Sequence, residues 1–116
     1  MSRSAYQPDR GDLVWLDFTP NAGTDQSGRR PGLVLSPGAF NIAIGLMFVC
    51  PIANQGKGSS FEVALPKGAG ITGFVLSDHL RSLDWIARNA TLVGKVSDEV
   101  LWQVAGRVEA ILRINL

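Results

Sequence analysis

The chain has 116 residues, of which 46% are hydrophobic and 18% are charged, and its formal net charge is +1. This length and composition predict one globular domain over residues 1–116 and exclude an intrinsically disordered protein. Because the net charge is close to zero, any nucleic-acid-binding surface must be local.

Cysteine and histidine are too few for several kinds of site. Cys50 is the only cysteine and His79 the only histidine, which excludes an intrachain disulfide and makes a Cys/His metal cluster untenable. A lone thiol in an apolar run, such as Cys50, is typically buried. No stretch has the apolar length of a signal peptide or of a membrane span. We therefore expect a cytoplasmic protein with no metal, no other cofactor and no membrane partner.

Short apolar runs alternate with turn-rich loops over most of the chain. The segment DLVWLDF (12–18) predicts a strand that is covered on both faces, with Trp15 in the core. Residues 19–31 have almost no aliphatic side chains and predict a long loop. Further strands are predicted at 32–36, 45–52, 61–65 and 72–78, with one or two more in 81–96 and a polar loop at 53–60.

The last segment changes to a helical period. Residues 97–112 place six apolar side chains on one helical face, with Ser97 as N-cap and two acidic residues in the first turn. We expect Trp102 to be a core residue and Gly106 to permit close packing. Strands followed by one helix predict a mainly β fold, a small twisted antiparallel barrel with the C-terminal α-helix packed on it. The apolar face consists of Val100, Leu101, Val104, Val108, Ile111 and Leu112.

Motifs of several enzyme classes are absent from the sequence. It has no phosphate-binding loop, no GxGxxG, no HExxH and no CxxC. A Ser–His–Asp triad would have to use His79, and no serine lies in a GxSxG elbow. The candidate chemistry therefore depends on polar and basic side chains in the two predicted loops.

The two polar loops each allow two interpretations. Arg29 and Arg30 precede Pro31, which favours an extended backbone from which a guanidinium can be aimed at a phosphate. Alternatively, both arginines are solvated surface charges. The loop at 53–60 either brings its glycine backbone and Lys57 close to a ligand or is a flexible hairpin loop.

Several residues near the fifth predicted strand are also candidates. Asp78 and His79 are neighbours at its end, which predicts side chains on opposite faces of a strand. His79 either meets a ligand or is an ordinary structural or exposed histidine. Trp85 is more typical of a core or an interface than of a platform that stacks on a base. Arg81 and Arg88 either extend a basic surface or are solvated.

Three blocks of sequence carry a resemblance to a known family. GDLVWLDFTPNAGTDQSGRRPGLVLSP, VCPIANQGKG…FEV and GFVLSDHLRSLDW closely resemble the MazF/PemK family of toxin endoribonucleases, in order and from about Pro8 to the final helix. The resemblance implies an SH3-like barrel that forms a homodimer. It also implies a toxin that cleaves single-stranded RNA at short motifs without metal and so inhibits translation. A cognate antitoxin with an acidic C-terminal segment would cover the RNA groove.

The resemblance places the family's catalytic arginine on Arg30 and its catalytic threonine on Ala53. Metal-free cleavage uses the ribose 2′-hydroxyl as nucleophile and leaves 2′,3′-cyclic phosphate and 5′-hydroxyl ends. A permanently charged guanidinium suits phosphate stabilisation better than general-base catalysis. Alanine has no hydroxyl, and a lost transition-state hydrogen bond commonly costs about 10²–10³ in rate. Either Asn54 or a nearby backbone N–H takes over, or the activity is weak.

Other positions match the family's RNA-contacting segments. In the first loop these are an acidic–glutamine pair and an arginine, and His79 stands where some members have glutamine. The implied RNA-binding residues are Asp25, Gln26, Arg29, Asn54, Gln55, Lys57, Asp78 and His79.

Two alternatives remain beside the ribonuclease. Ala53 is compatible with a catalytically dead family member that only binds an antitoxin. The barrel is also shared by CcdB-like toxins that bind DNA gyrase. That branch lacks the Arg-Pro first loop and ends in Trp-Gly-Ile, whereas this sequence ends ILRINL.

Overall fold

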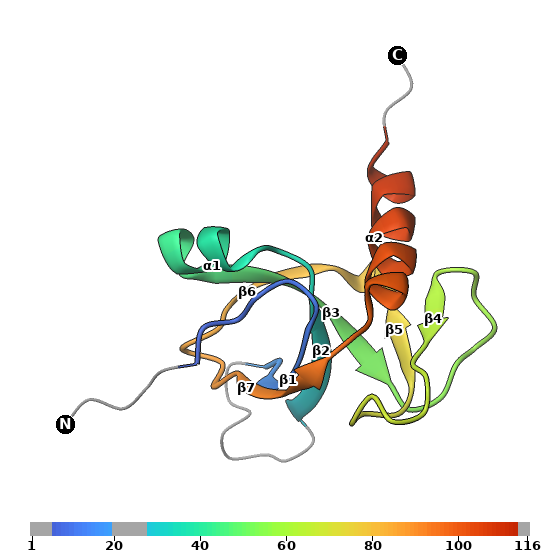
Figure 1. The fold of residues 1–116 in the computed structure, drawn as a ribbon, viewed down its shortest axis with the longest axis horizontal. Coiled ribbons are helices and arrows are strands. Elements are labelled where there is room, and N and C mark those ends of the chain that lie inside the picture. Colours follow the sequence, from blue (N-terminus) through green and yellow to red (C-terminus); the bar gives the residue numbers. More distant parts are fainter. Residues whose placement is uncertain (1–5, 20–27, 114–116) are drawn as a thin grey trace.

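The computed structural model describes residues 6–19 and 28–113, which contain seven strands and two α-helices. Figure 1 shows a strongly curved sheet, with α2 standing against one side of it and α1 beside the far end of β3. The elements are β1 (Asp12–Asp17), β2 (Arg29–Val34), α1 (Gly38–Ile44), β3 (Leu46–Ala53), β4 (Glu62–Ala64), β5 (Phe74–Leu76), the 3-10 helix η3 (Ser77–His79), β6 (Arg81–Asp84), β7 (Thr91–Lys95) and α2 (Asp98–Leu112).

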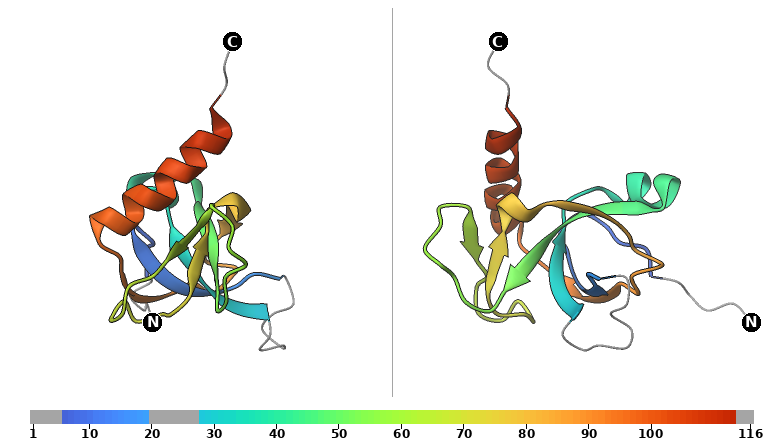
Figure 2. Two further views of the ribbon diagram at one scale, coloured as in Figure 1. Left: turned by 90° about the vertical axis from the view of Figure 1, so that its right-hand side faces the viewer. Right: turned by 180° about the vertical axis from the view of Figure 1, so that it is seen from behind.

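Strand β3 is the centre of the sheet. The strand order is β4-β5-β3-β2-β1-β7, β6 also pairs with β3, and all the pairs are antiparallel. One edge of β3 pairs with β2, while the other edge pairs first with β6 and then, at Ile52 and Ala53, with β5. The sheet curls without closing (Figure 2), and its barrel-like form with a C-terminal helix confirms the predicted fold class.

Two hydrophobic clusters cover the two faces of the central strands. Leu13 belongs to the cluster beneath α2, whereas its neighbour Val14 belongs to the second cluster. The expectation that segment 12–18 is covered on both faces is therefore confirmed. The cluster beneath α2 contains Leu13, Leu33, Cys50, Ile52, Val63, Ile71, Val75, Val100 and Val104. The second contains Val14, Leu16, Phe18, Val34, Met47, Val49, Leu83 and Trp85.

The three tryptophans differ in burial. Trp85 is buried and its indole N–H donates to the Asn41 carbonyl at 3.1 Å, so it belongs to the core. Trp15 and Trp102 are 39% and 77% exposed, so the expectation that both are core residues is wrong. α2 buries Val100 and Val104, and Trp102 projects from another side of the same helix.

The extent and the N-cap of helix α2 were predicted correctly. Ser97 is its N-cap, and its hydroxyl accepts a hydrogen bond from the backbone N–H of Val100 at 3.3 Å. A Cβ at Gly106 would have no atom within 4 Å, so the expected close packing at this glycine is wrong. Within the described residues no helix is long and apolar enough to cross a membrane.

Helix α1 was not predicted from the sequence. It has seven residues, follows Pro37 and has no acidic side chain in its first turn. Tertiary hydrogen bonds hold it: the buried Asn41 amide donates to the carbonyls of Pro8 at 2.9 Å and Ser36 at 3.1 Å. Such contacts leave no periodic signal in the sequence.

Candidate active site

Arg30 lies where β2 and β3 part. The ladder between these strands ends at Gly32 and Pro51, and the next residues on the same face are Arg30 and Ala53. Gly32 lets the strands pack closely up to this point, because a Cβ there would lie 2.7 Å from Cγ2 of Val49. Arg30 is exposed and forms no side-chain hydrogen bond or ion pair with any described residue. No described residue therefore engages its guanidinium, which can bind a ligand.

Arg29 has a different environment from its neighbour. Its guanidinium donates to Oδ1 of Asp17 at 3.0 Å, to the Asn89 carbonyl at 3.0 Å and to Oγ1 of Thr91 at 3.1 Å. Asp17 also accepts from the Asn89 amide at 2.8 Å. The hydrogen bonds from Asn89 and then Arg29 lower the pKa of the Asp17 carboxyl, against the effect of desolvation. Arg29 thus has a structural role in joining β2 to β1 and β7, and its contact with RNA stays a prediction.

A small cavity lies beside Ala53, and we call it the polar hollow. Its volume is about 170 Å³, and it brings together four of the residues predicted to bind RNA. Asn54 is exposed and does not line it. Asp25 and Gln26 lie outside the described residues. The lining residues are Ala53, Gln55, Lys57, Ser59, Glu62, Leu76, Asp78 and His79.

The loop that forms one wall of the polar hollow is anchored to β4. The Glu62 carboxylate accepts hydrogen bonds from the backbone N–H of Lys57 at 2.8 and 3.1 Å and of Gly58 at 3.3 Å. A Cβ at Gly56 would lie 2.6 Å from Oε1 of Glu62. These contacts favour an ordered loop over a freely flexible hairpin. Glu62 was not predicted as a site residue, although its place in an alternating strand directly after a glycine-rich loop is a usable signal.

Ala53 lies where β3 and β5 approach each other unusually closely. It pairs with Phe74 of β5, and a Cβ at the preceding Gly73 would lie 2.3 Å from the Ala53 carbonyl oxygen. Gly73 has φ +133°, which only glycine adopts readily. The backbone of residue 53 is thus fixed between Arg30 and η3, while its methyl group supplies no hydrogen bond.

Asp78 and His79 both line the polar hollow, so the expectation that they point to opposite faces is wrong. β5 ends at Leu76 and the chain enters η3, where successive side chains no longer alternate by half a turn. Nε2 of His79 lies 3.8 Å from Oδ1 of Asp78. Helix α2 and β3 both pack on η3. The sequence predicted a strand up to residue 78 because it carries no signal for the 3-10 helix that separates β5 from β6.

Two further arginines flank the second hydrophobic cluster. The Arg81 guanidinium lies 5.8 Å from the centroid of the Phe18 ring, a cation–π contact, and Arg81 is exposed. Because Arg81 pairs with Val49, it lies on the same face of the sheet as Arg30. Arg88 instead donates to the carbonyls of Asp17 and Phe18, so it stabilises the fold. Arg81 is thus the second exposed cation near the parting of β2 and β3.

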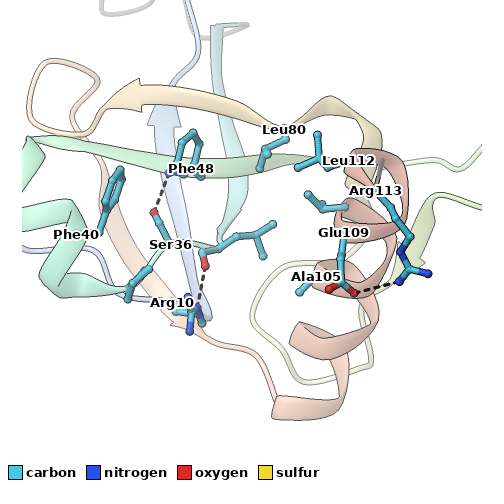
Figure 3. Close-up of a pocket in the computed structure, with 12 residues that line it drawn as sticks. Arg10, Ser36, Phe40, Phe48, Leu80, Ala105, Glu109, Leu112 and Arg113 are labelled. Carbon is cyan, nitrogen blue, oxygen red and sulfur yellow. Dashed lines mark hydrogen bonds and ion pairs between the residues drawn. The ribbon is translucent and has the colours of Figure 1, made fainter. Parts of the chain in front are cut away.

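A larger apolar cavity lies near the other end of β3, and we call it the apolar hollow (Figure 3). Its volume is about 750 Å³. Figure 3 shows Phe40 and Phe48 on one side and Leu112 and Ala105 of α2 on the other. The two phenyl rings stack with centroids 5.5 Å apart. The lining residues are Arg10, Leu35, Ser36, Pro37, Phe40, Phe48, Leu80, Ala105, Val108, Glu109, Leu112 and Arg113.

Comparison with known proteins identifies relatives over nearly the whole chain. Residues 9–112 match the family described as PemK-like, MazF-like toxin of type II toxin-antitoxin systems. The chain is 40% identical over 109 residues to the endoribonuclease toxin MazF of Escherichia coli (strain K12), covering 94% of this chain and 97% of that protein. The crystal structure of MazF (Form-I) from Deinococcus radiodurans is 51% identical, has a TM-score of 0.85 and covers 93% of this chain and 98% of that one. That of the same organism's MazE-MazF (Form-II) is 45% identical with a TM-score of 0.85, covering 96% and 100%.

Proposed function

The chain belongs to the family of PemK-like, MazF-like toxins of type II toxin-antitoxin systems, and from this premise we propose that it is a toxin endoribonuclease that cleaves single-stranded RNA. The observation that carries this proposal is the exposed Arg30 at the parting of β2 and β3, on the same face of the sheet as Ala53, which lines the polar hollow. The family match over residues 9–112 supports one toxin domain across the chain. Cleavage of messenger RNA would take place in the cytoplasm.

The proposed reaction is an internal transesterification. The ribose 2′-oxygen attacks the adjacent phosphorus, the bond from phosphorus to the 5′-oxygen breaks, and the products carry 2′,3′-cyclic phosphate and 5′-hydroxyl ends. Arg30 binds the phosphate oxygens through charge-assisted hydrogen bonds that strengthen as negative charge develops on them. This role requires a cation that stays charged and is not engaged by a carboxylate, and Arg30 meets both requirements among the described residues.

The RNA backbone would run along the face that carries the exposed cations. Arg30 and Arg81 lie on that face, and Lys57 lines the adjacent polar hollow. Because the salt dependence of RNA affinity grows with the number of phosphate contacts, few contacts imply an affinity that falls only moderately as the salt concentration rises. The remaining RNA-binding residues in this proposal are Asp25, Gln26, Asn54, Gln55, Asp78 and His79.

We include a homodimer in the proposal, formed through the apolar hollow. Phe48 is 38% and Leu112 65% exposed, and contiguous apolar surface of this kind marks interfaces. Most soluble homo-oligomers have a two-fold axis, which would bring the same hollow of each protomer together. The relative from Deinococcus radiodurans was solved as MazE-MazF, which supports a cognate antitoxin for this chain as well. An acidic C-terminal segment of that antitoxin would pair with Arg30 and exclude RNA.

The test is cleavage of a long single-stranded RNA by the purified chain in EDTA, with the new ends mapped. We expect cuts at one short motif with 5′-hydroxyl ends. Arg30→Ala should slow cleavage about 10³-fold, because it removes the cation at the reacting phosphate. Lys67→Ala is the matched control, since it removes one exposed positive charge that does not line the polar hollow.

Two outcomes would contradict the proposal. Equal rates for the parent and Arg30→Ala would remove Arg30 from the mechanism. If neither the parent nor Ala53→Thr cleaves RNA, the dead family member that only binds antitoxin becomes the better interpretation, and Ala53 is the residue that favours it. The gyrase-binding alternative has no support in the family match.

A further inference from the structure

We infer that His79 is the proton-transfer residue of this ribonuclease, in place of the hydroxyl that residue 53 lacks, and that Asp78 positions it. This inference rests on the proposed function and deepens it, since it assigns a second catalytic residue beside Arg30. The juxtaposition that carries it is the polar hollow, which Ala53 and His79 line together.

The hollow brings together one residue of β3 and one residue of η3. Ala53 is the last residue of β3 and pairs with Phe74 of β5, and η3 follows β5 directly. The close approach of Gly73 to the Ala53 carbonyl fixes the pairing of β3 with β5 at this point. A methyl group at residue 53 leaves the roughly 170 Å³ beside it open. The His79 side chain is 56% exposed, so a nucleotide in the hollow can reach it.

The imidazole also has a carboxylate partner. Oδ1 of Asp78 lies 3.8 Å from Nε2 of His79, within ion-pair distance. The carboxylate is therefore placed to orient the imidazole toward the hollow. The Glu62 carboxylate is already bound to the N–H groups of Lys57 and Gly58. The charged groups around η3 are Asp78 on η3 itself, Lys57 after β3, Glu62 on β4, Arg81 on β6 and Arg107 on α2, which donates to the Ser60 and Gln103 carbonyls.

The proton balance of the reaction shows what His79 would do. The neutral imidazole takes the proton of the 2′-hydroxyl while the bond from the 2′-oxygen to phosphorus forms. The bond from phosphorus to the 5′-oxygen breaks, and the leaving 5′-oxygen takes a proton from water. The imidazolium then gives its proton to the hydroxide that remains, which restores neutral His79. Arg30 stays charged throughout and stabilises the phosphate oxygens. Histidine is the side chain whose charge change normally falls between pH 5 and 8, which suits a base that works near neutrality.

The first experiment is a pH–rate profile for RNA cleavage by the parent and three variants. We expect His79→Gln to reduce kcat/KM about 10²-fold at pH 7.5 and to abolish the rise in rate between pH 5 and 7, since general bases contribute about 10²–10⁴. Asp78→Asn should reduce kcat/KM less than His79→Gln does, with the loss in kcat rather than in KM, as expected of a positioning residue. Gln103→Ala, which removes an exposed polar side chain of α2 outside the lining of the hollow, is the control and should keep the parent profile.

The second experiment uses the fact that His79 is the only histidine. Its imidazole C–H signals in the proton NMR spectrum are therefore unambiguous. The probe is a DNA copy of the cut sequence, which lacks every 2′-hydroxyl and cannot be cleaved. We expect the His79 signals to shift on adding this DNA, and to stay in place when the same DNA is added to Arg30→Ala at a concentration that leaves it unbound.

The outcomes separate this inference from the proposed function. If the parent cleaves and His79→Gln retains its rate and profile, the His79 role is overturned and the ribonuclease stands. If only Ala53→Thr cleaves, His79 does not replace the hydroxyl, although the fold and groove are correct. If no variant cleaves, the proposed function falls, and this inference falls with it.

Discussion

The two ends of β3 face different environments, although only four residues lie between Phe48 and Ala53. Near Phe48 the strand borders the apolar hollow of about 750 Å³, with stacked phenyl rings and the apolar side of α2. At Ala53 it borders the polar hollow of about 170 Å³, with two carboxylates, a lysine and the only histidine. One strand thus serves both the proposed association of protomers and the proposed chemistry.

The difference follows from which segment pairs with each part of the strand. Near Phe48, β6 continues the sheet and presents alternating side chains. Near Ala53, β2 parts from β3 and the segment between β5 and β6 coils into η3. Regular pairing leaves a surface suited to packing, whereas interrupted pairing leaves side chains that converge on a small space.

The largest expected effect is at the polar end, for Gly73→Ala. A methyl group would lie 2.3 Å from the Ala53 carbonyl oxygen at φ +133°, so the strands must separate. We expect a loss of about 3 kcal/mol in the free energy of unfolding, measured by urea denaturation. Gly68→Ala is the matched control, because it also has positive φ (+88°) but no atom within 4 Å of the added Cβ. Equal losses for the two variants would mean that this close approach does not matter.

The next effect is at the apolar end, for Phe48→Asp. A charge in the apolar hollow would be desolvated in the proposed dimer. We expect the dissociation constant of the dimer to rise at least about 30-fold, since central aromatic residues commonly contribute about 2 kcal/mol to an interface. Sedimentation equilibrium measures it. Trp102→Asp is the control: it changes an exposed aromatic residue that lies on α2 outside the hollow, and it should leave association unchanged. A parent that is monomeric at all concentrations would contradict the dimer.

The smallest effect separates Arg29 from Arg30. Asp17→Asn removes the carboxylate that holds Arg29, and we expect a loss of about 1.5 kcal/mol at pH 7 without a change in the cleavage rate of the folded protein. The pKa of Asp17 is lowered by folding, so its contribution is present above the ordinary pKa of aspartate, about 4, and is lost as the pH falls through the lowered value. Urea denaturation at pH 7, 5 and 3 should therefore show the two proteins converging in acid. A cleavage rate that falls as much as for Arg30→Ala would return Arg29 to the site.

The sequence predicted the elements whose side chains follow a simple period. The apolar run of 12–18 and the helical face of 97–112 predicted β1 and α2, because a strand covered on both faces and an amphipathic helix each leave a recognisable pattern. It failed where tertiary contacts decide the structure. The hydrogen bonds of Asn41 that hold α1 and the interruption at η3 leave no such pattern.

The candidate site was predicted only in part, for a related reason. The resemblance located Arg30 and position 53, and the ladder between β2 and β3 brings them to the same face. The residues that shape the hollow around them were not predicted. Glu62 acts through backbone N–H groups and Gly73 through the absence of a side chain, and neither is a signal for chemistry in a single sequence.

Cys50 lies between the two ends of β3 and gives the molecule an internal reporter. It is the only thiol, it is fully buried, and desolvation raises its pKa to about 12. Alkylating reagents react with the thiolate, so the folded chain should resist them. The rate of labelling therefore measures how often the centre of β3 opens to solvent. A ligand bound at either end that slows this labelling would do so by holding the whole strand in place.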